Sequence, residues 1–222
     1  MCKSQISLIL TLLVASAGLM GCASMSGLQT ARVLEKGKVQ STFGGGYYSS
    51  GDIAASVNDT EDGEDIDMPF LEYSYRQGVG HNWDVGLKVT LIGTAVLDGK
   101  YNFYSGDKWA LAAGLGLGYL SIETESGDEK SETTILDFML PLYASYDVSE
   151  KVSIYTVPKY IHRSISGEGS GSSALLGATL GLKIGKEWGS MLEVGQFRDL
   201  DEDLDISQAN VAFFWHPDKT WF

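Results

Sequence analysis

The sequence predicts an all-β fold: an antiparallel up-and-down transmembrane β-barrel of ten strands, with eight strands as the alternative. Three observations support this prediction. From Lys38 onward apolar and polar residues alternate, and no helical period is sustained. Short turns alternate along the chain with connections that are mostly long and acidic, which is the pattern of membrane barrels. Tryptophans recur where strands meet the short turns.

The N-terminus has the features of a secretory signal peptide. Lys3 supplies a positive charge, and an apolar stretch follows over residues 6–20. This stretch is too short, and is wrongly flanked, for a spanning helix. We therefore expect residues 1–21 to be removed, residues 22–37 to form a tether, and residues 38–222 to form the barrel domain.

The end of this signal segment carries a motif. Residues 19–22 read Leu-Met-Gly-Cys, which resembles the lipobox of bacterial lipoprotein signal peptides, although Met20 departs from the usual small or branched residue. The resemblance implies cleavage before Cys22, a diacylglycerol on its thiol, and handling by the lipoprotein-sorting machinery. Residue 23 is Ala rather than Asp, as in lipoproteins sent on to the outer membrane. Ordinary cleavage a few residues later, which leaves no lipid, is the alternative.

Composition excludes several classes of protein. The only cysteines are Cys2 and Cys22, and the first leaves with the signal, so a disulfide-stapled domain is excluded. The formal net charge of −13 argues against nucleic acid as a partner, because phosphate binding needs a basic face. No stretch after residue 22 is long and apolar enough for a transmembrane helix, so a membrane would have to be crossed by strands. No cofactor is expected.

The alternating pattern locates the strands. We expect them at 38–48, 68–78, 82–92, 95–105, 108–122, 133–147, 151–163, 174–186, 189–198 and 206–216. One face of these strands is apolar, as from Trp83 to Leu91, and the other carries small and charged residues. Pro141 and Pro158 cannot donate to a strand ladder, so we expect a bulge or a locally open seam around them.

The connections differ in kind. Three of them, 49–67, 123–133 and 199–205, hold seventeen carboxylates and one lysine. We expect them to be solvated loops at the end of the barrel opposite the short turns. An even number of strands would return both termini to the end with the short turns. Weak Ca²⁺ binding by Asp201, Asp203 and Asp205 is a sharper hypothesis, although the spacing of an EF-hand loop is absent.

Aromatic residues collect at one height. At the short-turn ends lie four tryptophans, Trp83, Trp109, Trp188 and Trp215. Amphipathic rings in this arrangement form a girdle at a membrane interface.

The chain resembles small bacterial outer-membrane β-barrel proteins in its lipobox, its regular succession of strands and turns, and its terminal Trp221-Phe222. The resemblance implies an outer-membrane location, extracellular loops, periplasmic termini with a periplasmic tether, contacts with membrane lipid and lipopolysaccharide, and insertion by the barrel-assembly machinery.

The inner face of the barrel is expected to carry charges of both signs. The inward-facing set comprises Glu72, Arg76, Asp84, Lys88, Asp98, Lys100, Asp137, Lys159, Arg163, Lys183 and Glu193. Five acids nearly balance six bases, and unpaired charges in a narrow barrel are costly. We therefore expect a network of charged side chains that plugs the lumen. A narrow conducting path is the alternative.

Weak candidates for catalysis lie near one loop: His162, Ser164 and Glu168. A His-x-Ser pair on one strand face can place a base beside a nucleophile. The pair is similar to the His/Ser arrangement of outer-membrane lipid A deacylases, but Ile165 follows the serine and those enzymes have eight strands.

The prediction is therefore a non-enzymatic membrane barrel, tethered by lipid at Cys22, with a structural or surface-interaction role. Three alternatives stay open: a small channel, a lipid hydrolase, and a lipid-anchored soluble barrel like a lipocalin. In the soluble barrel the apolar face would point inward. The length of the strands and the girdle at one end favour the membrane.

Overall fold

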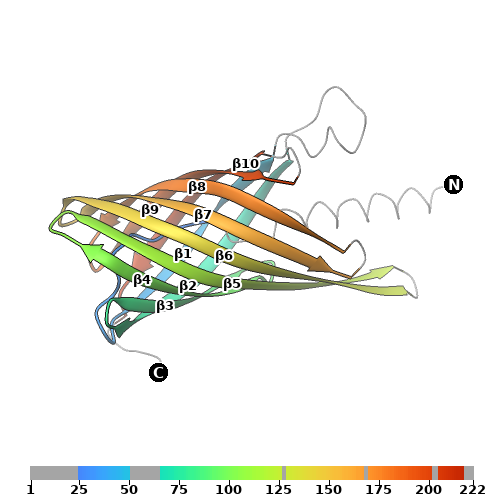
Figure 1. Cartoon of the computed structure of the whole chain (residues 1–222), viewed down its shortest axis with the longest axis horizontal. Coiled ribbons are helices and arrows are strands. Elements are labelled where there is room, and N and C mark those ends of the chain that lie inside the picture. Colours follow the sequence, from blue (N-terminus) through green and yellow to red (C-terminus); the bar gives the residue numbers. More distant parts are fainter. Residues whose placement is uncertain (1–24, 51–65, 127–128, 168–169, 202–204, 218–222) are drawn as a thin grey trace.

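The protein folds as a single closed barrel of antiparallel strands (Figure 1). The computed structural model describes residues 25–50, 66–126, 129–167, 170–201 and 205–217. The strands are β1 (Val39–Ser50), β2 (Ile66–Gly80), β3 (Trp83–Thr90), β4 (Ala95–Ser105), β5 (Trp109–Ser126), β6 (Glu129–Ser149), β7 (Val152–Ser166), β8 (Gly171–Gly185), β9 (Trp188–Asp199) and β10 (Asp205–Trp215). Each strand pairs with its neighbours in sequence, and β1 closes the barrel against β10. The all-β fold and the count of ten strands are confirmed, and eight strands are excluded.

The two ends of the barrel differ. We call the end with the β2–β3, β4–β5, β6–β7 and β8–β9 connections the turn end, and the other end the loop end. At the turn end, His81 and Asn82 have φ angles of 53° and 62°, as a two-residue hairpin turn requires. Within the described residues, no helix is both long and apolar enough to cross a membrane.

The outer surface of the barrel is apolar. Along β10, exposed and buried residues alternate, and the exposed ones include Val211. Leu97 and Leu117, which face each other across β4 and β5, are 62% and 58% exposed. A soluble lipocalin-like barrel would turn such side chains inward. An apolar wall of this extent needs hydrocarbon around it, so the fold is a transmembrane β-barrel.

The four predicted girdle tryptophans lie at the turn end. Trp83, Trp109 and Trp188 each begin a strand and are 45%, 54% and 69% exposed on the outside. Trp215 ends β10 opposite Trp188. The ring of Trp109 lies 4.8 Å from that of Tyr146 between centroids. The rings therefore occupy one height on the outer wall.

The predicted acidic loop at 123–133 is mostly strand. The pairing of β5 with β6 continues to Ser126 opposite Glu129, so this hairpin reaches beyond the neighbouring strands (Figure 1). The prediction was wrong because it weighed charge alone. Two adjacent antiparallel strands supply each other's backbone hydrogen-bond partners, so the ladder can continue past the neighbouring strands even where acidic residues are frequent.

The two prolines open the seam between β6 and β7 without shifting it. The pairing passes from Pro141 opposite Lys159 to Ala144 opposite Thr156, so the sum of the paired residue numbers stays constant. The missing proline donor interrupts the ladder, and no residue is inserted. In this pair of strands the register shifts instead between Asp147 and Ser149, beside the turn.

Candidate functional site: the occupied lumen

The N-terminal residues of the described chain lie inside the barrel. We call residues 25–34 the threaded segment. Met25, Ser26, Leu28 and Ala31 have exposed fractions of 1%, 1%, 3% and 0%. This arrangement corrects the prediction of an N-terminal tether over residues 22–37, because residues 25–34 of that range fill the lumen and only 35–37 are exposed before the chain enters β1.

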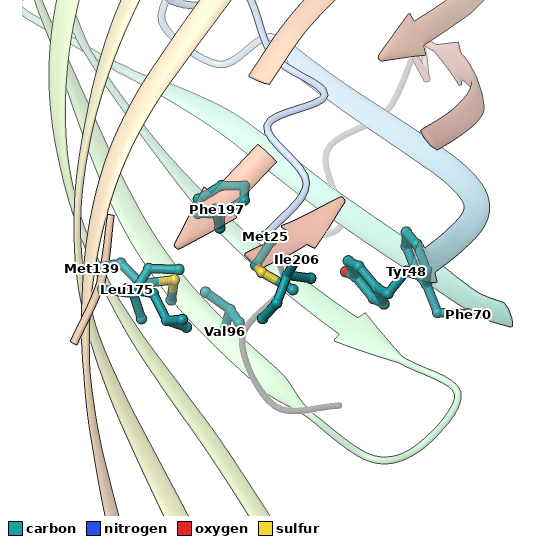
Figure 2. Packing of buried hydrophobic residues seen from close by; sticks show 9 residues of the cluster. Met25, Tyr48, Phe70, Val96, Met139, Leu175, Phe197 and Ile206 are labelled. Carbon is teal, nitrogen blue, oxygen red and sulfur yellow. The ribbon is translucent and has the colours of Figure 1, made fainter. Parts of the chain in front are cut away.

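The threaded segment runs along the lumen from the loop end to the turn end. Met25 packs among Phe197, Ile206 and Val96 in the loop-end half of the lumen (Figure 2). At the other end, Arg32 reaches the β4–β5 turn, where its Nη2 donates to the carbonyl of Gly106 at 3.0 Å. The expectation that both termini lie at the turn end was therefore wrong for the described chain, which begins at the loop end and ends at the turn end.

Three apolar side chains of the threaded segment enter separate clusters. Met25 belongs to the cluster of Tyr48, Phe70, Val96, Met139, Ile161, Leu175, Phe197 and Ile206. Leu28 packs with Met191, Ala212 and Phe214. Ala31 packs with Ala110, Ala112, Tyr143, Tyr155 and Val157. The segment is thus held along its length by burial of apolar surface as well as by polar contacts.

Glu193 of β9 holds the backbone of the threaded segment. Its carboxylate accepts hydrogen bonds from the N–H groups of Gly27 at 2.8 Å and Leu28 at 2.7 Å. Asn210 of β10 donates to the same carboxylate at 3.0 Å. Leu28 has a φ of 40°, so two successive N–H groups converge on one anion as in a backbone nest. A buried carboxylate that accepts several N–H groups is well satisfied.

Three lysines bind carbonyl oxygens of the threaded segment. Lys159 Nζ donates to the carbonyls of Met25 at 3.2 Å and Ser26 at 3.1 Å. Lys88 Nζ donates to the Ser26 carbonyl at 3.1 Å. Lys100 Nζ donates to the carbonyls of Thr30 and Arg32 at 2.9 and 3.2 Å. These lysines therefore donate hydrogen bonds to backbone carbonyl oxygens that have no partner within the extended segment itself.

Neutral and acidic side chains complete the contacts. Ser26 Oγ donates to the Glu72 carboxylate at 2.7–2.8 Å and accepts from Lys88. Asn102 Nδ2 donates to the carbonyl of Ala31 at 2.9 Å. At the turn end, Arg32 Nε lies 2.6 Å from Asp147 Oδ2.

All eleven predicted lumen charges belong to this interior. Among the carboxylates of this set that form ion pairs, Asp98 has the most exposed side chain, and that side chain is only 12% exposed. Arg76 bridges Asp84 and Asp98, and Arg163 pairs with Asp137 at 2.9 Å. Further pairs join Lys88 to Glu72 at 3.6 Å and Lys100 to Asp84 at 3.5 Å. Lys183 lies with its Nζ 4.4 Å from the ring centroid of Phe214.

The nature of the plug differs from the prediction. Charged side chains alone were expected to fill the lumen, whereas here they surround a length of polypeptide. Beside Ser26 and Gly27 a cavity of about 30 Å³ remains, room for about one water. At the turn end a wider recess of about 570 Å³ is lined by residues that include Arg32, Asp147 and His216. The middle of the lumen is therefore filled and its turn-end mouth is hollowed.

Sequence reasoning missed several residues of this site. They are Ser26, Gly27, Leu28, Ala31, Arg32, Asn102, Asp147, Gln208 and Asn210. One feature of the sequence could have indicated this site. In β10 the inward positions carry the amides Gln208 and Asn210, on either side of the outward Ala209. Polar amides in a lumen need partners, and neighbouring strands supply few.

The weak catalytic candidates lie elsewhere. His162 and Ser164 are both exposed on the outer face of β7, opposite Phe138 and Leu136 of β6. Glu168 lies outside the described residues. The pair therefore shares a face, but that face is the apolar outer wall.

The predicted Ca²⁺ ligands are divided. Asp203 lies outside the described residues, and Asp205 begins β10. Asp201 Oδ2 accepts from the N–H of Ala174 at 3.0 Å, which ties the loop to β8. Within the described residues, no group of three or more His, Cys, Asp or Glu is arranged to hold a metal ion.

Comparison with known proteins finds bacterial membrane barrels at low similarity. Ail, the attachment invasion locus protein of Yersinia pestis, is 12% identical with a TM-score of 0.36, over 82% of this chain and 99% of that one. The translocator domain of the autotransporter NalP from Neisseria meningitidis is 12% identical with a TM-score of 0.43, over 96% of each chain. The N-terminal β-barrel domain of Pseudomonas aeruginosa OprF is 11% identical with a TM-score of 0.36, over 82% and 100%. No family model and no curated protein matches the chain.

Fold and lumen together define a class of protein. It is a transmembrane β-barrel whose interior is occupied by the segment that precedes its first strand.

Proposed function

We propose that the protein is a bacterial outer-membrane barrel lipoprotein, anchored by lipid on Cys22, that does not conduct and has a structural or surface-interaction role. The observation that carries this proposal is the threaded segment. Its backbone is bonded to side chains of the wall from Met25 to Arg32, and apolar clusters surround three of its side chains.

The proposal also includes an orientation. The loop end faces outward, and the turn end, with the Trp girdle, faces the periplasm. Lipid and lipopolysaccharide are then the molecules that contact the outer wall, and the barrel-assembly and lipoprotein-sorting machineries deliver the chain. The apolar wall and the lipobox-like residues 19–22 support this proposal.

Conductance in planar bilayers tests whether the lumen is sealed. The wild-type protein is expected to give no stepwise currents, because its lumen holds polypeptide where ions would pass. A variant that lacks residues 24–34 is expected to give discrete open steps, since the lumen is then vacated. A deletion of the same length within the β1–β2 loop, over residues 53–63, is the matched control and is expected to stay closed. Steady wild-type currents as large as those of the 24–34 deletion would support the channel alternative instead.

A further inference from the structure

We infer that the mature N-terminus is displayed at the loop end of the barrel, so that a lipid on Cys22 lies in the leaflet at the loop end rather than at the turn end. This inference rests on the proposed function for the lipid and for the outward orientation of the loops. Under that orientation the protein is a lipoprotein whose anchor has passed through its own barrel to the cell surface.

The level of Met25 in the barrel fixes the point of exit. Its carbonyl accepts from Gln208 Nε2 at 3.3 Å. Gln208 lies opposite Tyr48, which is two residues from the loop-end limit of β1 at Ser50. Tyr48 also stacks on Phe70 with 4.3 Å between ring centroids, at the loop-end start of β2. Met25 is therefore near the loop-end rim of this part of the wall.

The direction of the chain is fixed by contacts at both ends. From Met25 the segment passes Glu193 at Gly27 and Lys100 at Thr30, and Arg32 then reaches the β4–β5 turn. The chain bends there, and the N–H of Gly37 donates to the carbonyl of Gly78 at 2.8 Å. It then enters β1 and runs back toward the loop end. The described chain therefore enters the lumen from its loop end, at Met25.

Chain length excludes a return to the turn end. Cys22 precedes Met25 by three residues, which reach at most roughly 11 Å when fully extended. The threaded segment itself uses the eight residues from Met25 to Arg32 to reach the turn end. The lumen offers no parallel path, since a Cβ added to Gly27 would lie 2.7–2.9 Å from Glu193, Thr179 and Val157.

The consequence concerns the lipid. A diacylglycerol chain at the turn end would insert in the periplasmic leaflet. From the loop end, the same lipid can reach only the opposite leaflet, beside the exposed apolar residues of β1 such as Tyr47. The lipid then acts as a clamp, because the segment cannot slide back through the filled lumen while its acyl chains are held in the membrane.

Thiol labelling of intact cells tests this topology. Lipidation leaves the mature wild-type chain without a free thiol, so the Ser24→Cys variant introduces one. Exposed to a membrane-impermeant maleimide, S24C is expected to label on intact cells. The matched controls are Ser170→Cys in the β7–β8 loop, which should also label, and Glu150→Cys in the β6–β7 turn, which should label only after permeabilisation. Labelling of S24C only after permeabilisation would overturn the inference.

A second measurement covers the case in which residue 24 is not reactive. A protease site inserted between Ala23 and Ser24 is expected to be cut on intact cells, whereas the same site between Glu150 and Lys151 is not. Cleavage at both sites only in lysed cells would also overturn the inference.

The controls separate this inference from the proposed function. If S170C fails to label on intact cells while E150C labels, the proposed orientation is wrong. If both controls behave as expected and S24C follows E150C, only the inference fails. Labelling of the wild type on intact cells would show a free Cys22, which refutes lipidation and supports display of the N-terminus.

Discussion

Glu193 is the residue on which the threaded segment depends most directly. One carboxylate receives two successive backbone N–H groups, and these lie 165 and 166 residues away in sequence. A glutamine there offers one acceptor oxygen, and its amide N–H₂ faces a donor. Residues 27 and 28 then cannot both be satisfied in a buried site.

Replacing Glu193 with Gln is expected to destabilise the barrel by about 2 kcal/mol, the usual range for hydrogen bonds to a buried charge. The measurement is the guanidinium midpoint for loss of the compact, unboiled band on a gel. Glu187→Gln, an exposed acid in the β8–β9 turn, is the matched control and should leave the midpoint unchanged. Equal midpoints for E193Q and the wild type would contradict the assigned contacts.

Gly27 tests how tightly the lumen is packed. A methyl group at this position would lie 2.7 Å from Glu193 Oε2 and 2.8 Å from Thr179 Oγ1. Gly27→Ala is therefore expected to cost about 1–3 kcal/mol by overpacking, read from the same guanidinium midpoint. Gly171→Ala provides the control, because nothing lies within 4 Å of its added Cβ. If both variants unfold at the same midpoint, the segment is not held as described.

At the scale of the element, alternation along a strand gives one face toward hydrocarbon and the other toward the lumen. In β5 the outward Leu115, Leu117 and Tyr119 are 49%, 58% and 49% exposed, while glycines face inward between them. The strand therefore has an apolar face that favours hydrocarbon and a small-residue face that leaves room for polypeptide in the lumen.

Replacing Leu117 with Arg is expected to cost about 1–4 kcal/mol when the protein refolds into phospholipid vesicles, because a cation on the lipid face costs most at the midplane and less toward the interfaces. Glu150→Arg at the exposed β6–β7 turn is the control and should cost little. The measurement is the free energy of refolding of each variant and of the wild type, obtained from guanidinium titrations in vesicles. An unchanged free energy for L117R would mean that this face does not meet hydrocarbon.

The elements were largely predictable from the sequence. Period-two alternation, short turns and the four tryptophans depend on residues close together in the chain, so they predicted ten strands with the correct order and nearly the correct bounds. The β5–β6 extension was missed because acidic residues were taken as a sign of a loop. Pairing energy depends on the opposite strand as well as on charge.

At the scale of the whole molecule, the ten strands form a closed barrel, since β1 and β10 pair over Ser41 to Ser50. Such a barrel unfolds cooperatively, because opening any seam leaves unpaired backbone in hydrocarbon.

We therefore expect a compact band that shifts on boiling. Protease added to intact cells should cut within residues 51–65, and the rest of the barrel should stay joined as one compact species. The control is the boiled sample, in which protease should cut throughout. Release of the protein by carbonate, without any heat shift, would contradict a membrane-spanning barrel.

The sequence by itself determined the strands of the barrel wall, and only the tertiary structure showed that residues 25–34 fill the lumen. Alternation and turn spacing are local properties that separate the two faces of each strand, and the strand lengths with the tryptophan girdle favoured the membrane for the apolar face. They also place Glu193, Lys100 and Lys159 on the inside, as separate charges. The threaded segment has no such period. Its position depends on backbone groups finding partners that are 50 to 183 residues away, and only the closed barrel brings those partners within bonding distance.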